Sequence, residues 1–212
     1  MVERFFSVRQ ADRLNDNQSD PIALLSGPPS CGKTSLLFQF AFNSASQCNR
    51  HVVFICNRRK LESKPPYLSQ VLLSSVFSHT ITNKGIDPSS DTFQRIQMKS
   101  CQEKYNNPRG RDLAMVRTLA LCHNAVNHAN KTGPCKLLLS DTHHGDSPRL
   151  LFIYKRWVPA IFTIRGDGSG SFFLMKSNSS SGSGSSVRTR TANYSIALQY
   201  LFLEEITQDS EL

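Results

Sequence analysis

The segment of residues 27–34 constrains the fold of this 212-residue chain more than any other part of its sequence. It reads Gly-Pro-Pro-Ser-Cys-Gly-Lys-Thr and fits the pattern G-x-x-x-x-G-K-[ST]. The apolar residues 21–26 precede it with the length of a buried strand, and residues 35–42 follow it with a helix-forming, apolar pattern. A strand, a glycine-bounded loop and a helix in this order predict an α/β fold with a P-loop. The alternative is an ordinary Gly/Pro loop between the same two elements.

Each position of this loop has a chemical role toward a bound phosphate. The glycines allow close backbone approach, so that successive N–H groups form an anion nest, and the following helix adds its partial positive charge. Lys33 is expected to reach the β- and γ-phosphates, and Thr34 to offer its hydroxyl to Mg²⁺. Residues 83–86 lack the aspartate of the N-K-x-D pattern, which favours ATP over GTP. The predicted nucleotide-binding residues are Gly27, Pro28, Pro29, Ser30, Cys31, Gly32, Lys33, Thr34 and Ser35.

A second apolar strand, predicted at residues 137–141, ends in the carboxylate of Asp141. Three leucines, a serine and an aspartate match the hhhhD pattern of a Walker B strand, whose carboxylate orients Mg²⁺, here through a water. The polar residues 142–146 that follow could line the site. Together with Cys135 their histidines show no zinc-ligand spacing, and a solvated loop is the favoured interpretation.

No carboxylate is well placed in the sequence to activate a water for ATP hydrolysis. Glu62 is the one acid soon after the strand predicted at residues 51–56, which runs instead into Arg58, Arg59 and Lys60. We therefore expect ATP hydrolysis to be slow or absent.

The remaining patterns divide the chain into segments. Residues 1–20 are expected to be an irregular lead-in, 21–175 the P-loop domain, 176–191 a flexible Ser/Gly-rich linker and 192–212 a C-terminal segment of helix or strand. Within the domain the patterns predict helices at 67–77 and 112–129, a strand at 93–98 and a hairpin at 157–174. Residues 150–154 are expected to supply at most one short strand.

Charge and cysteine usage indicate the compartment and the kind of partner. The chain carries 25 Lys+Arg against 16 Asp+Glu, a formal charge of +9, which favours a polyanion such as nucleic acid. Its six cysteines include no C-x-x-C pair, the N-terminus lacks a long apolar run, and no run has the length of a membrane span. We expect no membrane association and a reducing compartment, the nucleus or the cytoplasm.

The order of motifs resembles a known family. Four motifs in this order resemble those of the RecA-like recombinase paralogues. They are the P-loop, Arg-Arg-x-Leu-x-Ser-x-Pro at 58–65, Arg-Ile-Gln-Met at 95–98 and Leu-Leu-Leu-Ser-Asp at 137–141. Within that group the sequence is most similar to the SWIM-type zinc-finger-associated ATPase of the Shu complex.

The resemblance implies a RecA-like, mostly parallel sheet flanked by helices, with a C-terminal β-hairpin. It implies ATP binding through Gly32, Lys33 and Thr34, magnesium coordination assisted by Asp141, and binding of single-stranded DNA. The implied partners are a SWIM-domain zinc-finger protein and a recombinase, and the process is homologous recombination repair in the nucleus. Ile161 follows Asp141 by only 20 positions, so the core is expected to be shortened after the Walker B strand.

Two other functions remain open on the sequence. A small-molecule phosphotransferase would need an Arg-bearing lid, for which Arg109 and Arg111 are the candidates. A non-catalytic scaffold would keep the P-loop as a structural element. Separately, the positive nest could lower the pKa of Cys31, so that its thiolate forms and can be oxidised. The alternative is that Cys31 is there only because a small residue fits.

Overall fold

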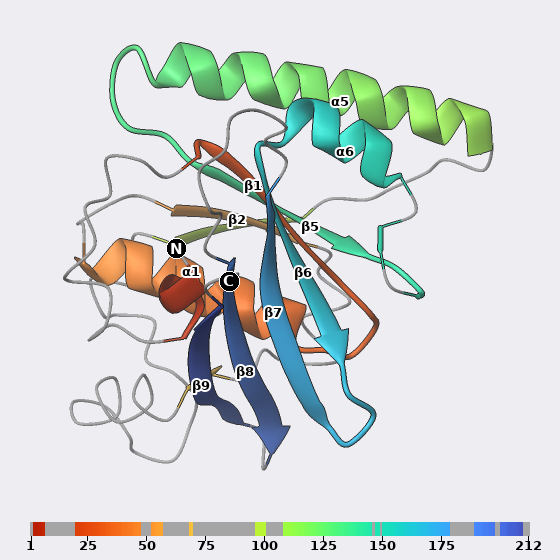
Figure 1. Ribbon diagram of the computed structural model, residues 1–212. Helices are drawn as coiled ribbons and strands as arrows, with labels where there is room; N and C mark the ends of the chain where they lie inside the picture. Colours follow the sequence, from red (N-terminus) through yellow and green to blue (C-terminus); the bar gives the residue numbers. More distant parts are fainter. Residues whose placement is uncertain are drawn as a thin grey trace. The chain divides into compact units, whose positions relative to one another are not determined.

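The computed structural model describes ten segments of the chain (Figure 1), namely residues 2–6, 20–47, 52–56, 68–69, 96–100, 108–145, 147–148, 150–178, 189–197 and 200–209. They belong to two compact units. The β1 unit is made of residues 16–31, 103–191 and 206–212, and the α1 unit of residues 1–15, 32–102 and 192–205. The chain passes from the first to the second inside the P-loop, between Cys31 and Gly32.

The β1 unit contains a mixed sheet in which β1 (Ile22–Gly27) is flanked on both sides. Its strands lie in the order β7-β6-β1-β5, with β5 at Leu137–Thr142, β6 at Ala160–Gly166 and β7 at Ser171–Asn178. Strand β1 pairs in parallel with β5 and β6, whereas β6 and β7 are antiparallel. All six residues of β1 are buried, which explains why its sequence is a continuous apolar run rather than an alternating one.

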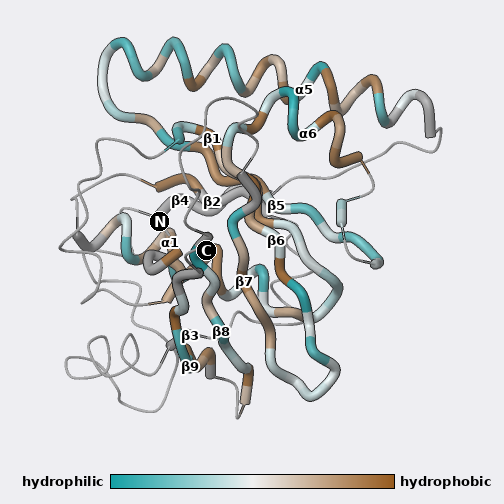
Figure 2. The backbone as a smooth tube through the Cα atoms, in the orientation of Figure 1, coloured by the Kyte–Doolittle hydropathy of each residue, from teal (hydrophilic) through white to brown (hydrophobic). Residues whose placement is uncertain are grey.

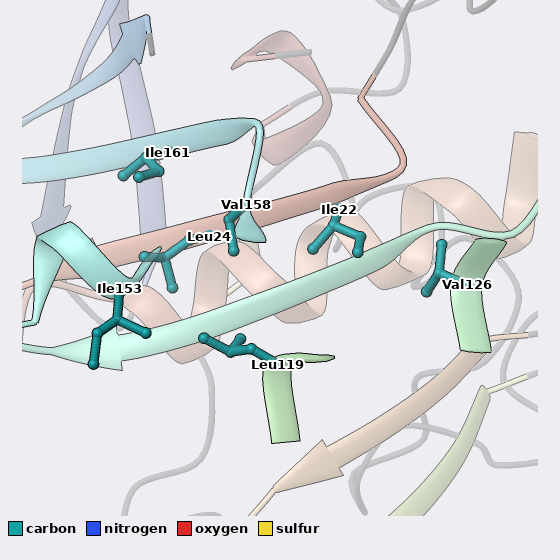
Figure 3. Packing of buried hydrophobic residues seen from close by; sticks show 7 residues of the cluster. All are labelled: Ile22, Leu24, Leu119, Val126, Ile153, Val158 and Ile161. Atoms are coloured by element: carbon teal, nitrogen blue, oxygen red, sulfur yellow. The ribbon is translucent and has the colours of Figure 1, made fainter. Parts of the chain in front are cut away.

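Two helices pack on this sheet, α5 (Pro108–Ala129) and α6 (Leu151–Trp157), which lie side by side at the top of Figure 1. Figure 2 shows α5 alternating between hydrophilic and hydrophobic residues, as expected of a helix with one packed face. The buried cluster between helices and sheet is drawn in Figure 3 and consists of Ile22, Leu24, Leu119, Val126, Ile153, Val158 and Ile161. No described helix is long and apolar enough to cross a membrane.

The α1 unit is built around α1 (Lys33–Gln47). A 3₁₀ helix, η1 (Val2–Phe5), packs on it, and the rings of Phe5 and Phe40 lie 5.3 Å apart. Strand β2 (Val52–Cys56) pairs in parallel with β4 (Ile96–Ser100). The strand β3 (Leu68–Ser69) pairs with β9 (Tyr200–Asp209), which also neighbours β8 (Thr189–Ala197).

Most of the elements predicted from the sequence are present. The predictions for residues 21–26, 51–56, 93–98 and 137–141 correspond to β1, β2, β4 and β5. Those for residues 35–42, 112–129 and 157–174 correspond to α1, α5 and the β6–β7 hairpin. The α/β class is therefore confirmed, with a mixed sheet.

The strand predicted at 150–154 is wrong, because this segment forms α6. A chain that leaves β5 must cross over β1 to enter β6 in parallel, and such a crossover usually contains a helix. Ile153 is buried in the cluster while Phe152 is exposed, a pattern that five residues are too few to reveal.

Other boundaries also differ from the predictions. Residues 2–5 of the irregular lead-in form η1, because Phe5 and Phe6 are buried, and Leu68–Ser69 form a strand instead of part of a helix. Residues 192–197 and 200–209 are strands. A linker was predicted for residues 176–191, but residues 176–178 belong to β7 and residues 189–191 to β8. The residues between them lie outside the described part of the chain.

Candidate functional site

The loop of residues 27–34 joins the carboxyl end of β1 to the first residue of α1, as the motif requires. Its backbone takes a left-handed conformation at two alternate positions, Ser30 with φ 62° and Gly32 with φ 79°. Among the described residues, Ser30 is the one non-glycine residue with positive φ, a conformation that costs roughly 1–2 kcal/mol. Alternating backbone signs of this kind turn successive N–H groups toward one centre and make an anion-binding nest.

The side chains of the loop differ in their access to solvent. Gly27 and Cys31 are buried, whereas Ser30 and Thr34 are exposed. Lys33 is only 9 % exposed at the start of α1, whose first turn is closed by the Leu36 N–H donating to the Gly32 carbonyl at 2.9 Å. The loop thus combines an exposed threonine and a buried lysine at the positive end of a helix.

Gly27 has no room for a side chain. A Cβ added there would lie 2.8 Å from the Cβ of Ile164 and 2.9 Å from the Sγ of Cys31. The first glycine of the motif is therefore required by packing between β1 and β6, in addition to any role toward a ligand. This contact also explains Cys31, whose side chain is fully buried. Such a thiol is shielded from oxidants. The structure therefore favours the interpretation that Cys31 is a small residue that fits the space, and not the one in which it is a reactive thiolate.

We predict that Gly27→Ala lowers the free energy of unfolding by about 1–3 kcal/mol, because the new methyl group overpacks the contact with Ile164. Urea denaturation followed by circular dichroism measures the change. Gly133→Ala is the matched control, since a Cβ there meets nothing within 4 Å, and we expect a change of less than about 0.5 kcal/mol. Equal effects of the two substitutions would show that the packing at Gly27 does not require glycine.

Asp141 lies on the strand beside the P-loop strand, opposite Ser26 in the register of β1 and β5. It is half-buried, and its Oδ1 accepts a hydrogen bond from the Thr142 N–H at 2.8 Å. The structure thus brings Asp141 to the level of the residue before Gly27. Thr34 belongs to the other unit, so a magnesium site shared by Thr34 and Asp141 stays a prediction.

A buried pair of polar side chains holds these two strand ends together. The Ser26 hydroxyl and Nδ1 of His143 are hydrogen-bonded at 2.7 Å, and the His143 N–H donates to the Gly27 carbonyl at 3.2 Å. The solvated loop expected at residues 142–146 is therefore wrong at His143, which is 3 % exposed, whereas His144 is exposed. The sequence offered one signal, since His143 is two positions beyond Asp141 and a strand places such residues on the same face.

A pocket of about 550 Å³ lies within the β1 unit, next to the first residues of the P-loop. The β6–β7 hairpin forms its other wall. The lining residues are Pro28, Pro29, Gly145, Ile164, Arg165, Gly166, Gly168, Gly170, Ser171 and Phe172. The sequence predicted this hairpin but not its place beside the loop, because the pairing of β1 with β6 joins residues far apart in the chain.

The tip of the hairpin is held by Asp167. Its carboxylate accepts hydrogen bonds from the Ser169 N–H at 2.8 Å, from the Ser169 hydroxyl and from the Ser171 N–H at 3.2 Å. The hydrogen bond from the Ser169 side chain, followed by that from its backbone, lowers the pKa of Asp167 below its usual value. Asp167 is therefore ionised near neutral pH, and its charge is engaged within the turn.

The other residues singled out in the sequence either have a different structural setting than expected or lie outside the described residues. Arg109 and Arg111, the candidates for a phosphotransferase lid, lie in the first turn of α5 and not in a loop. Glu62, residues 58–60 and residues 83–86 lie outside the described residues.

Within the described part of the chain, no group of three or more His, Cys, Asp or Glu residues could hold a metal ion by itself. A hydroxyl and a carboxylate are nevertheless the hard oxygen donors that Mg²⁺ takes beside nucleotide phosphates.

Comparison with known proteins assigns no family. No family model matches the sequence, and no curated protein matches it. Among solved structures, the chain is similar to a KaiC-like protein of the hyperthermophilic archaeon Pyrococcus horikoshii OT3, with a TM-score of 0.47 and 11 % identity over 87 % of this chain and 89 % of that one. A match at this level assigns no residue a role, so the function rests on the loop and its surroundings.

Proposed function

We propose that this chain is a P-loop nucleotide-binding protein that takes ATP with Mg²⁺. The observation that carries the proposal is the backbone of residues 27–34, where the motif's spacing coincides with left-handed conformations at Ser30 and Gly32. An ordinary Gly/Pro loop has no need of a strained serine, whereas strain of this kind is typical of ligand-binding loops. The loop also joins a fully buried strand to a helix N-terminus, the context in which the motif binds phosphate.

Different residues of the loop and of β5 would bind different parts of the nucleotide and its metal ion. The N–H groups of the loop and the start of α1 would bind the phosphates, and the ammonium group of Lys33 would neutralise their charge. Thr34 would donate its hydroxyl oxygen to Mg²⁺, and Asp141 would orient a water of the same ion. Magnesium, when bound, would supply positive charge that offsets the negative charge of the phosphates.

We further propose a RecA-like core and a role as an accessory subunit in homologous recombination, with single-stranded DNA as a ligand. The motif order that resembles the recombinase paralogues supports this proposal, as do the surplus of 25 Lys+Arg over 16 Asp+Glu and the parallel β5-β1-β6 arrangement. The partners would be a SWIM-domain zinc-finger protein and a recombinase, and the site of action the nucleus, with the cytoplasm as the alternative. ATP hydrolysis would be weak, because Asp141 is assigned to magnesium and no glutamate accompanies it.

The test is a joint measurement of ATP and DNA binding by the purified chain. We expect a fluorescent ATP analogue to bind more tightly with Mg²⁺ than without it. A labelled single-stranded oligonucleotide should bind at low salt, and three phosphate contacts would weaken its affinity about twentyfold between 50 and 200 mM salt.

The two parts of the proposal fail separately. Absence of analogue binding at millimolar concentration, by a chain that circular dichroism shows to be folded, would remove the nucleotide proposal. Normal analogue binding without any DNA binding at low salt, with and without a SWIM-domain partner, would remove the recombination role alone.

A further inference from the structure

Arg165 stands out among the residues beside the P-loop. It is exposed, and it is the one charged residue among those that line the 550 Å³ pocket. No ion pair or hydrogen bond engages its side chain within the described part of the chain. An uncompensated guanidinium group that faces the same pocket as a phosphate-binding loop is available for an anionic ligand.

The register of the sheet explains how Arg165 comes to lie there. The pairing of β1 with β6 ends at Ser26 and Thr163, and Ile164 then packs against Gly27. Strand β1 ends at Gly27, whereas β6 continues to Gly166. Arg165 is thus carried past the end of β1 to the level of the loop. Because the loop residues before Gly32 and the whole hairpin belong to the same unit, this placement is fixed within it.

The loop itself lacks donors on this side. Pro28 and Pro29 have no backbone N–H, so two positions that could bind phosphate in a P-loop contribute nothing to the nest. Both prolines line the pocket together with Arg165. A guanidinium group has five N–H donors and binds phosphate in a bidentate way, so it can replace the donors that the prolines remove.

We propose that Arg165 binds the terminal phosphate of a nucleoside triphosphate held by the loop and makes the site prefer ATP to ADP. The inference rests on the proposed nucleotide binding. The α- and β-phosphates are common to the two nucleotides and are held by the N–H groups of the loop. The terminal phosphate, which ADP lacks, lies against the proline side of the loop, where Arg165 is the one charged residue that lines the pocket.

The experiment compares the dissociation constants of Mg·ATP and Mg·ADP for the wild type, Arg165→Ala and Arg165→Lys. We expect the alanine variant to bind ATP about ten- to hundredfold more weakly, the range for lost hydrogen bonds to a charged group, with ADP unchanged. The lysine variant should fall between, because a point charge replaces a bidentate fork. Arg156→Ala, at an exposed cation of α6 in the same unit, should bind both nucleotides as the wild type does.

Three outcomes would overturn the inference. The first is that Arg165→Ala weakens ATP and ADP by the same factor, and the second is that it changes neither. The third is that Arg156→Ala has the same selective effect, which would indicate a general charge effect. A wild type that binds neither nucleotide is a separate result, because it removes the proposed function before any variant is compared. Thermal denaturation checks that each variant is folded, and substitution of the exposed Arg165 should leave it unchanged.

Discussion

Replacing Lys33 with alanine should weaken the binding of Mg·ATP by at least about a hundredfold, the largest effect of any single substitution in the loop. The residue is only 9 % exposed, and water screens the charge of a buried lysine less than that of an exposed one. The prolines at positions 28 and 29 reduce the number of backbone donors, and the phosphates then depend more on cationic side chains such as Lys33. Fluorescence titration with an ATP analogue, or calorimetry, measures the loss.

Lys155→Ala is the matched control for this substitution. Lys155 is an exposed lysine of α6, far in sequence from the loop, and its removal changes the net charge by the same amount. We expect its ATP affinity to be that of the wild type. If Lys33→Ala bound the analogue as tightly as Lys155→Ala does, the loop would not be the nucleotide site. Repair activity that survived Lys33→Ala while ATP binding was lost would favour the scaffold function instead.

Leu24→Ala should lower the free energy of unfolding by about 3–5 kcal/mol. Leu24 is fully buried at the centre of the cluster between β1 and the two helices of its unit, so truncation removes apolar contacts and leaves a cavity (Figure 3). A well-packed core collapses poorly around such a cavity, and the cost therefore exceeds the transfer free energy of the deleted atoms. Urea denaturation monitored by circular dichroism gives the value.

The control is Leu121→Ala, the same substitution on the outer face of α5, where the leucine is 69 % exposed. We expect a change of no more than about 0.5 kcal/mol, because little apolar surface leaves water at that position on folding. A loss below about 1 kcal/mol for Leu24→Ala, or equal losses for the two variants, would contradict the packing described for the β1 unit.

The sequence predicted the elements whose determinants are local. Residues 21–35 contain in one stretch the apolar run, the two motif glycines and the helix-forming residues that define β1, the loop and the start of α1. The β6–β7 hairpin was also predictable, because its glycine-rich turn lies between two short apolar runs. In each case the residues that decide the conformation are neighbours in the chain.

The features that the sequence missed depend on contacts between distant residues. Segment 150–154 is helical because a parallel crossover has to connect β5 to β6, and nothing within those residues states this. The hydrogen bond between Ser26 and His143 joins residues 117 positions apart, and its existence follows from the register of β1 and β5. Arg165 reads as an ordinary surface cation until the pairing of β1 with β6 brings it beside the loop.

The composition of residues 28–30 has a consequence for how a ligand would be received. Each proline fixes its own φ, and Ser30 has a side chain at a position where glycine would move freely. Such a segment is stiffer than a loop rich in glycine, and its conformational entropy is lost when the chain folds and not when a nucleotide arrives. Binding should therefore proceed with little rearrangement of the loop backbone, so that affinity is set mainly by charge and hydrogen bonding.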